Sequence, residues 1–402
     1  MSFQQGLSGL NAASKNLDVI GNNIANASTV GFKGSETRFA DVFASSNGSG
    51  AISVGIGTSV SAIMQNFGQG NIEVTSNPLD VAINGSGFFR MSQDGAVTYT
   101  RNGQFQLDSQ GYIVDAEAKN LTGYPPAAGG GVTTASPVNL QISNADLPPS
   151  PTAQATVGAT LDSREAALPA AGFNLADAAT YHGATSLSVY DSLGNAHTLS
   201  LYYVKTAANA WDVFAANDGV QVGAGAVGSM TFNTNGTAAA APPLALTLPV
   251  TTGAAPIAVT VDIAQSNQVG SPFSVKRLEQ DGFAAGRLTG FTISDVGLIT
   301  GRYTNGQTRA QGQIALTEFT NSQGLKQLGS NQWGETAASG PPLTGAPGSG
   351  NLGVINSGAV ETANIDLTAE LVDLITAQRV YQANAQTIKT QDQVLQTLVN
   401  MR

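Results

Sequence analysis

The C-terminal segment of this chain, residues 367–402, repeats an apolar residue at every seventh position. The repeated positions are Leu367, Leu374, Tyr381, Ile388 and Leu395, and Leu371 and Val399 lie at alternate positions of the same stripe. This spacing predicts a long helix of the coiled-coil type, whose apolar face has to be covered by another element. Asp366 or Thr368, followed by Glu370, is expected to cap the start of the helix.

A second and weaker helical pattern lies at the opposite end of the chain. Its large apolar positions are Phe3, Leu7, Leu10, Leu17 and Ile24. Gly6, Gly9 and Gly21 each cost roughly 0.5–1 kcal/mol relative to alanine inside a helix, so this helix is expected to form only when it is covered. Pairing with the C-terminal stripe would bring the chain ends together and nest the other domains between them. The alternative is two amphipathic helices that dock separately on a globular core.

Between about residues 50 and 360 the pattern changes to short strands and turns. Three segments show it most clearly: 99–115 around Asn102-Gly103, 186–205 around 193–195, and 286–319 with Asn305-Gly306. Each predicts strands joined by tight turns. The predicted fold class is therefore mainly β, with two nested, discontinuous β-domains and an α-helical coiled-coil domain formed by the N- and C-terminal segments. Segments rich in proline, alanine and glycine at 125–151 and 340–350 are expected to mark domain borders.

The composition is poor in charge. Charged residues make up 11% of the chain, against roughly 25% in an average soluble domain. The net charge of -10 argues against binding to nucleic acid, which needs clustered lysine and arginine. Cysteine is absent, so disulfides and thiolate chemistry are excluded. The first residues lack the pattern of a cleaved signal peptide and no apolar run is long enough to span a bilayer, so neither a cleaved signal nor membrane insertion is expected.

Motifs for catalysis or cofactor binding are not found in the sequence. His182 and His197 flank a strand-like segment without an evident set of acidic or sulfur ligands, so a metal site is not expected. The "INGSGFF" stretch at 83–89 lacks the third glycine and the helix of a dinucleotide-binding motif. Carboxylates are scattered, and no spacing suggests an acid–base pair. The chain is predicted to have no catalytic residues and no cofactor, and not to be an enzyme.

One stretch of the middle, between Asp218 and Asp262, contains no charged residue. It either provides a surface that packs against copies of the chain without ion pairs, or forms a variable outer domain of low complexity. The second interpretation is favoured.

Five segments, in this order along the chain, resemble the motifs of a known family. They are "NLDVIGNNIANASTVGFKGS" (16–35), "NPLDVAINGSGFF" (77–89), "YTRNGQFQLDSQGYIV" (99–114), "NSQGLKQLGSNQWGETAASGPP" (321–342) and the segment 357–402. Together they resemble the motifs of bacterial flagellar axial proteins, the family of rod, hook and hook-junction subunits. The long insertion at about 145–283 favours a hook subunit over a distal rod subunit. A secreted β-rich adhesin is the alternative from another class, and a glycan hydrolase is a remoter one.

The resemblance implies four parts and an assembly. The parts are a helical coiled-coil domain (1–30 with 358–402), a connecting segment (31–71), a middle β-domain (72–144 with 284–357) and an inserted outer β-domain (145–283). The implied function is polymerisation into a flexible curved tube that transmits torque from rod to filament as a universal joint. The implied partners are copies of the chain itself, the flagellar rod, hook cap and hook-filament junction proteins, and the type III export apparatus. The implied location is the flagellum, outside the cell.

The asparagine-rich stretch at 20–34 is the candidate contact region between subunits. Its candidate residues are Asn22, Asn23, Asn26, Phe32 and Lys33. The asparagines can satisfy free backbone groups where the first helix ends, and Phe32 can anchor a neighbouring chain. Lys33, Glu36 and Arg38 are expected to pair across subunits. The alternative is a plain helix end and loop with no contact between chains.

Overall fold

The computed structural model describes residues 2–42, 55–127, 131–133 and 136–400. The chain forms two compact units. Unit 1 comprises residues 1–143, 291–301 and 309–402, and unit 2 comprises residues 144–290 and 302–308. The finer division into four parts stays a prediction, and the two units are described separately below.

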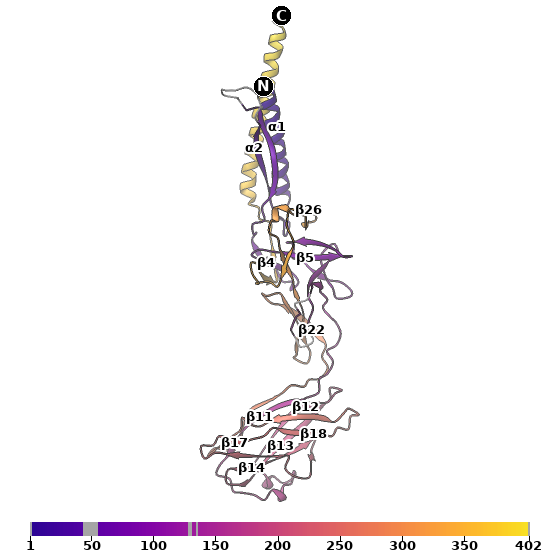
Figure 1. The fold of residues 1–402 in the computed structure, drawn as a ribbon, viewed down its shortest axis with the longest axis vertical. Helices are drawn as coiled ribbons and strands as arrows, with labels where there is room; N and C mark the ends of the chain where they lie inside the picture. The colour runs from indigo at the N-terminus through magenta and orange to yellow at the C-terminus, as the bar shows by residue number, and fades with distance from the viewer. Residues whose placement is uncertain (1, 43–54, 128–130, 134–135, 401–402) are drawn as a thin grey trace. The chain divides into compact units, whose positions relative to one another are not determined.

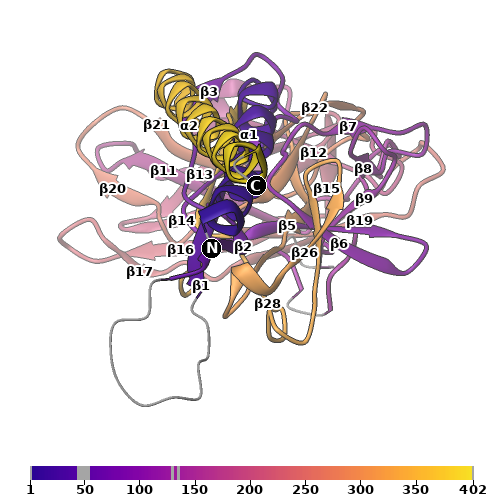
Figure 2. The same ribbon diagram turned by 90° about the horizontal axis from the view of Figure 1, so that it is seen from above.

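Unit 1 contains the two helices, α1 (Ser2–Ala25) and α2 (Leu367–Asn400). They run side by side in opposite directions (Figures 1 and 2), because Gly6 lies against Ile388 near the start of α1 and Asn23 bonds to Glu370 near its end. The predicted pairing of the chain ends is therefore confirmed. Among the described residues, neither helix is apolar over a stretch long enough to cross a membrane.

Asp366, one of the two residues expected to do so, caps the start of α2. Asp366 Oδ1 accepts hydrogen bonds from the backbone N–H groups of Thr368 (2.9 Å) and Ala369 (3.2 Å). These are two of the donors that a helix N-terminus leaves without a partner inside the helix. Asp366, not Thr368, is therefore the cap.

An antiparallel hairpin of two strands, β1 (Ser35–Val42) and β2 (Gly57–Gln65), follows α1. Its register pairs Ser35 with Gln65 and contains a bulge at Arg38 and Phe39. The hairpin packs along α1 (Figure 1). The predicted connecting segment 31–71 thus contains a β-hairpin, whose residues 43–54 lie outside the described part of the chain.

The remaining strands of unit 1 are short and come from both halves of the chain. They are β3 (Ile72–Val74), β4 (Val81–Asn84), β5 (Phe88–Gln93), β6 (Ala96–Thr100), β7 (Gln106–Leu107), β8 (Ile113–Val114), β9 (Asn120–Tyr124), β10 (Val138–Asn139), β25 (Leu316–Glu318), β26 (Lys326–Gly329), β27 (Gln332–Gly334), β28 (Leu343–Gly345), β29 (Val354–Ser357) and β30 (Ala359–Glu361), with a 3-10 turn at Ser322–Gly324. An aromatic cluster of Phe88, Tyr99, Phe319 and Trp333 forms one core here, with edge-to-face ring contacts.

The predicted hairpin around Asn102-Gly103 is wrong. β6 pairs with β5 through a tight turn at Asp94-Gly95, where both residues have positive φ angles (52° and 86°). Gly103 instead accepts a hydrogen bond from the N–H of Val81 (2.9 Å), and a side chain there would overlap the Val81 carbonyl. The glycine is needed for a close approach of two backbones, which in sequence looks like a turn.

Unit 2 is built from two sheets. One contains β11 (Gln154–Asp162), β18 (Leu244–Leu248), β19 (Ile257–Asp262), β20 (Asn267–Val269) and β21 (Ser274–Gln280). The other contains β12 (Gly183–Tyr190), β13 (Ala196–Ala207), β14 (Ala210–Asn217), β15 (Val220–Val222), β16 (Gly228–Phe232) and β17 (Ala238–Ala240). Two 3-10 turns, Ala170–Gly172 and Ala178–Thr180, lie between β11 and β12.

The core of unit 2 draws on the uncharged stretch. β18 and β19 alternate buried and exposed residues, and their buried leucine, valine and isoleucine side chains join Val157, Leu199 and Trp211 in one cluster. This period of two is what a strand with one covered face requires. The predicted hairpin at 193–195 is confirmed, since β12 and β13 pair with Tyr190 opposite Ala196.

The predicted run of strands at 286–319 is also confirmed. It forms β22 (Leu288–Ile293), β23 (Leu298–Tyr303) and β24 (Thr308–Ile314), followed by β25. Asn305-Gly306 makes the predicted turn, with Gly306 at φ 79° and its N–H bonded to Tyr303 O (3.0 Å). The division between the two units falls within these strands.

Candidate functional site

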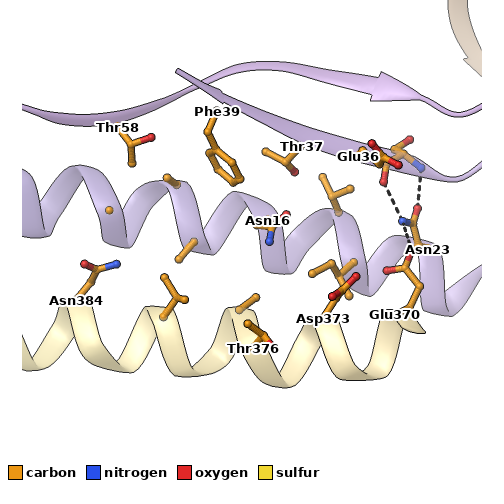
Figure 3. Close-up of a pocket in the computed structure, with 18 of the residues that line it drawn as sticks. Asn16, Asn23, Glu36, Thr37, Phe39, Thr58, Glu370, Asp373, Thr376 and Asn384 are labelled. Atoms are coloured by element: carbon orange, nitrogen blue, oxygen red, sulfur yellow. Dashed lines mark hydrogen bonds between the residues drawn. The ribbon is translucent and has the colours of Figure 1, made fainter. Parts of the chain in front are cut away.

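A groove of about 750 Å³ runs between α1, the β1–β2 hairpin and α2. Figure 3 shows the side chains that surround it. Gly9, Ala12 and Ala13 of α1 are among the residues that line it, and so are Asn23 and Glu370.

Two glycines of α1 lie directly against α2. A Cβ atom at Gly6 would lie 3.1 Å from Ile388 Cγ1, and one at Gly9 would lie 2.8 Å from Asn384 Oδ1. The buried positions of α1 are Gly6, Ala12, Ala13, Val19, Ile20 and Asn23. The absence of side chains at two of the contacts lets the helix backbones approach closely.

The expected seam residues of α1 are not among its fully buried positions, and their contact with α2 stays a prediction. Phe3 and Leu7 are both 44% exposed, and Leu10, Leu17 and Ile24 are only half-buried. A second seven-residue repeat, through Gly6, Ala13 and Ile20, was available in the sequence. It was missed because the search followed large apolar side chains. A role of the exposed residues in contacts between copies stays a prediction.

The expected seam residues of α2 differ in their burial. Leu374 and Ile388 are half-buried, and Ile388 contacts α1. The other predicted seam residues are exposed: Leu367, Leu371, Tyr381, Leu395 and Val399. Gly6, close to the N-terminal end of α1, already lies opposite Ile388. Leu395 and Val399 therefore lie beyond the N-terminal end of α1. The C-terminal end of α2 thus continues beyond its partner helix (Figure 1).

Asn23 joins three elements at one end of the groove. Its Nδ2 donates to Ser35 O and to Glu370 Oε1, both at 2.9 Å, and its Oδ1 accepts from Ser35 N (3.0 Å). Burial raises the pKa of the Glu370 carboxyl, the bond from Asn23 opposes this, and the nearby Asp373 and Glu36 carboxylates raise it further. Asn23 is thus fully engaged within its own chain.

The other two predicted asparagines shape the end of α1. Asn26 Nδ2 donates to Asn22 O (3.0 Å) and to Asn22 Oδ1 (3.1 Å), and Asn26 Oδ1 accepts from Thr29 (3.2 Å). These bonds satisfy groups at a helix C-terminus, as the alternative of a plain helix end requires. Asn22 is exposed, and Phe32 is half-buried beside a small cavity of about 210 Å³ that Trp333 also lines.

Lys33 does not pair across subunits, and that prediction is wrong. Its side chain is fully buried, and Nζ donates to Glu361 Oε1 (2.6 Å) and to Gly68 O (2.7 Å). Glu36 and Arg38 pair with each other within the chain at 3.1 Å, on the surface. The partner of Lys33 lies 328 positions away in the sequence, which local reasoning cannot reach.

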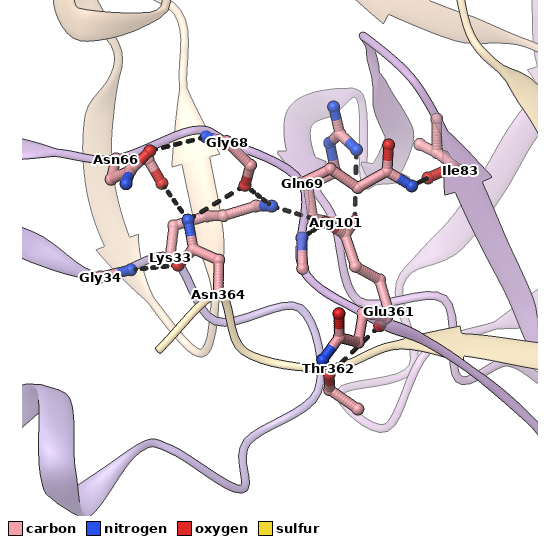
Figure 4. A network of polar contacts seen from close by, with 12 residues as sticks. Lys33, Gly34, Asn66, Gly68, Gln69, Ile83, Arg101, Glu361, Thr362 and Asn364 are labelled. Atoms are coloured by element: carbon pink, nitrogen blue, oxygen red, sulfur yellow. Dashed lines mark hydrogen bonds and ion pairs between the residues drawn. The ribbon is translucent and has the colours of Figure 1, made fainter. Parts of the chain in front are cut away.

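A second cation meets the same carboxylate (Figure 4). Arg101 Nη1 donates to Glu361 Oε2 (3.2 Å) and Nη2 donates to Gly85 O (2.9 Å), while the guanidinium lies 5.4 Å from the ring centre of Phe88. Burial lowers the pKa of both Lys33 and Arg101, and Glu361 opposes the effect. Sequence reasoning singled out neither Arg101 nor Glu361, although both lie in quoted motifs.

Glycines let the chain segments cross at this cluster. Gly31 has φ 70° and donates its N–H to Glu361 O (2.8 Å), and a side chain there would overlap the backbone of Arg101 and Asn102. A Cβ at Gly34 would overlap Ile365, and one at Gly70 would overlap Thr362 O. The glycines of "GFKG" are therefore explained by close backbone packing within the chain.

Unit 2 holds one buried histidine whose neighbours differ from expectation. His197 Nδ1 lies 2.6 Å from Asp218 Oδ2 and Nε2 lies 3.3 Å from Asp191 Oδ2, so acidic neighbours are present. The bond to Asp218 raises the pKa of His197, burial opposes it, and the bond to Asp191 adds to the rise. Among the described residues, no group of three or more histidine and carboxylate side chains is arranged to hold a metal ion.

Protein-family models match four successive parts of the chain. Residues 3–33 match the flagella basal body rod protein family, and residues 82–160 match the flagellar hook protein FlgE/F/G D1 domain. Residues 160–283 match the flagellar basal body protein FlaE D2 domain, and residues 356–401 match the flagellar basal body rod FlgEFG protein C-terminal family.

Curated relatives match along the entire chain. The flagellar hook protein FlgE of Escherichia coli is 42% identical and that of Salmonella typhimurium 41% identical, with 100% of both chains covered in each case. The FlgE of Rhizobium meliloti is 33% identical, covering 100% of this chain and 98% of the relative. The crystal structure of Helicobacter pylori FlgE2 has 14% identity and a TM-score of 0.56 over 72% of this chain and 100% of that one, a similarity of fold. Full-length matches at this identity show that the chain belongs to the flagellar hook protein family and is a structural subunit of the hook.

Proposed function

We propose that copies of this hook subunit polymerise through their helices into a flexible, curved tube that transmits torque from the flagellar rod to the filament. Membership of the hook and rod families supports assembly with copies of itself in the flagellum. One observation carries the proposal further: α2 keeps much of its apolar surface exposed, and its last turns extend beyond α1.

The exposed apolar residues of α2 are of two kinds. Leu367, Leu371 and Ile375 lie along the part that is paired with α1, and all are about half exposed. Leu395 and Val399 lie 7 and 11 residues beyond Ile388, which is about two and three helical turns, so they continue the face that contacts α1. A helix with this much uncovered apolar surface is incomplete as a single chain.

A second copy of the chain is the natural cover. Fully burying a leucine or valine is worth about 1.5–3 kcal/mol, so covering a half-exposed residue gains about 1 kcal/mol. That is too little for one residue to hold two copies together, but several such residues in every copy add up along a helical polymer, where each contact repeats. The helical pair would then be completed by its neighbours.

The test is electron microscopy of concentrated purified protein. The wild-type chain should form curved tubes, and Leu395→Asp should abolish them, since a carboxylate would have to be buried between copies. Gln393→Glu places the same charge at an exposed polar position two residues away and should leave tube formation intact. Tubes of normal appearance from Leu395→Asp would exclude the C-terminal end of α2 as an assembly surface.

The universal-joint part of the proposal rests on the scarcity of charge. Contacts in a bent, rotating tube lengthen and shorten with every turn. Buried ion pairs tolerate little change in geometry, whereas hydroxyl and amide groups can exchange partners through bridging water. With 11% charged residues, the chain has few ion pairs to offer at its outer surfaces.

We also propose export through the flagellar type III apparatus and contacts with rod, hook cap and hook-filament junction proteins, in line with the family. In the free monomer both terminal segments should be disordered and so remain threadable, because three glycines weaken α1. Limited proteolysis of the monomer should then remove both ends and stop near residues 70 and 357. Resistant termini would contradict disorder before assembly.

A further inference from the structure

The chain segments that link α1, the β1–β2 hairpin, the other β-strands of unit 1 and α2 all pass the cluster of Lys33, Arg101 and Glu361. The chain leaves α1 through residues 31–34, returns from the β1–β2 hairpin through 66–71, and enters α2 through 361–366. Figure 4 shows these segments crossing at the cluster. These three side chains are 0–5% exposed, and we call them the ion cluster.

We propose that the ion cluster is the joint that fixes the helical pair to the β-strands of unit 1, and that its rigidity contributes to the bending stiffness of the polymer. The joint is a property of the single chain. Its effect on stiffness rests on the proposed function.

The hydrogen bonds of Glu361 reach all the connections. Oε1 accepts from Lys33 on the outgoing segment (2.6 Å) and from the Gly70 N–H on the segment that returns from the hairpin (2.8 Å). Oε2 accepts from Arg101, which follows β6 and also holds Gly85 O. Glu361 itself ends β30, just before α2. One carboxylate therefore ties the three connections to the β-strands.

Neighbouring polar bonds reinforce the same crossing. The Asn364 side chain accepts from Gly34 N (2.8 Å) and donates to Asn66 O (2.7 Å) and Gly68 O (3.0 Å). It thus repeats the connection between the outgoing, returning and α2-entry segments on the helical side of Glu361. Two independent side chains, one charged and one neutral, hold the same three segments.

The charge balance shows that the cluster acts through geometry more than through stability. Two cations face one carboxylate, and the three side chains are buried. Buried ion pairs pay a large desolvation penalty and often add little net stability, but each partner must stay in place because a displaced charge is left unpaired. Such a cluster resists small displacements of the segments that carry it.

This charge balance supplies a sharp variant. Lys33→Met removes one of the two cations and leaves a one-to-one pair of Arg101 and Glu361, so the chain should still fold. It removes the two bonds of Nζ, to the Glu361 carboxylate and to Gly68 O, and leaves the backbone bond from Gly31 N–H to Glu361 O in place. The matched control is Arg38→Gln, which removes a cation from the exposed pair with Glu36 on the adjacent strand.

The experiment makes two measurements on the assembled polymer. In tubes, where the terminal segments are ordered, hydrogen exchange at the amides of Gly31 and Gly34 should be about tenfold faster in Lys33→Met than in wild type. Arg38→Gln should exchange like wild type. Tubes of Lys33→Met should bend more easily in electron micrographs, measured as a shorter persistence length than in wild type and in Arg38→Gln.

A second variant covers the case in which Lys33→Met fails to fold. Arg101→Met cuts the joint on the β-strand side and again leaves a one-to-one pair, so it should give the same loss of stiffness.

Unchanged exchange in both variants would overturn the joint, and faster exchange with unchanged persistence length would overturn its link to stiffness. If the wild-type chain forms no tubes at all, the proposed function fails, and exchange in the free chain decides the joint: unprotected amides at Gly31 and Gly34 of the wild type would overturn it.

Discussion

Removal of the single anion of the ion cluster should be among the most destabilising polar substitutions in unit 1. Glu361→Gln keeps the shape of the side chain and leaves Lys33 and Arg101 buried without a counter-ion. Breaking a buried pair in this way costs about 3–5 kcal/mol. The exposed pair of Glu36 and Arg38, with side chains 60% and 61% exposed, contributes about 0–1 kcal/mol. Glu361→Gln should therefore lower stability by at least about 2 kcal/mol more than Glu36→Gln.

The two tryptophans make this measurable in the full chain. Trp333 lies in the aromatic core of unit 1 and Trp211 in the core of unit 2, and the chain has no other tryptophan. Because a chain of two units does not unfold as one two-state system, the Trp211→Phe background isolates the unit 1 signal. Urea titration of assembled tubes, in which the terminal segments are ordered, followed by Trp333 fluorescence, then compares the stability of unit 1 between variants. A difference below about 1 kcal/mol between Glu361→Gln and Glu36→Gln would refute the reasoning, because a buried charge would then have found another partner.

The other predictions concern the helices, the buried histidine and the assembled tube. Gly21→Ala should stabilise assembled α1 by up to about 1 kcal/mol, since an added Cβ meets nothing within 4 Å, and thermal dissociation of tubes checks it. His197→Gln should destabilise unit 2 most below pH 6 and progressively less as the pH rises through the raised pKa of His197, because the protonated ring is what Asp218 stabilises; Trp211 fluorescence in a Trp333→Phe background measures this. Leu371→Asp should abolish tubes and leave the β-strands folded, whereas Leu374→Asp should also disturb the pairing of α2 with α1, seen by circular dichroism of the assembled and free chains. Tube stiffness should change little between low and physiological salt, and a strong salt response would contradict the argument from scarce charge.

The helical ends and the strand-rich middle were predictable because their patterns are local. The seven-residue repeat, the aspartate before it and the alternating residues of β12 and β13 each depend on neighbours within a few positions. The same local reasoning failed at Asn102-Gly103, where the glycine serves a backbone contact with Val81. A glycine needed for a turn and a glycine needed for a crossing have the same appearance in sequence.

The helix contact was predicted in outline and missed in detail. Large apolar residues suggested a seam through Leu7 and Leu17, whereas Gly6 and Gly9 lie directly against Ile388 and Asn384 of α2. Close packing of two helices favours small residues at the contact, and a count of large side chains cannot register them. The partner of Lys33 could not be predicted for a different reason. A charge 328 positions away in the sequence is brought near only by the complete fold.

The placement of charge suggests where the polymer deforms. The chain has few charged residues, yet three of them meet in a buried cluster at the crossing between helices and strands. A rigid crossing inside each copy and outer surfaces poor in ion pairs are complementary, because a tube under torque bends where its contacts are weakest. If the ion cluster holds unit 1 at this crossing, bending has to be taken up elsewhere, in the contacts between copies. Substitutions that add complementary charges at those contacts should then stiffen the tube, whereas substitutions in the ion cluster should soften it.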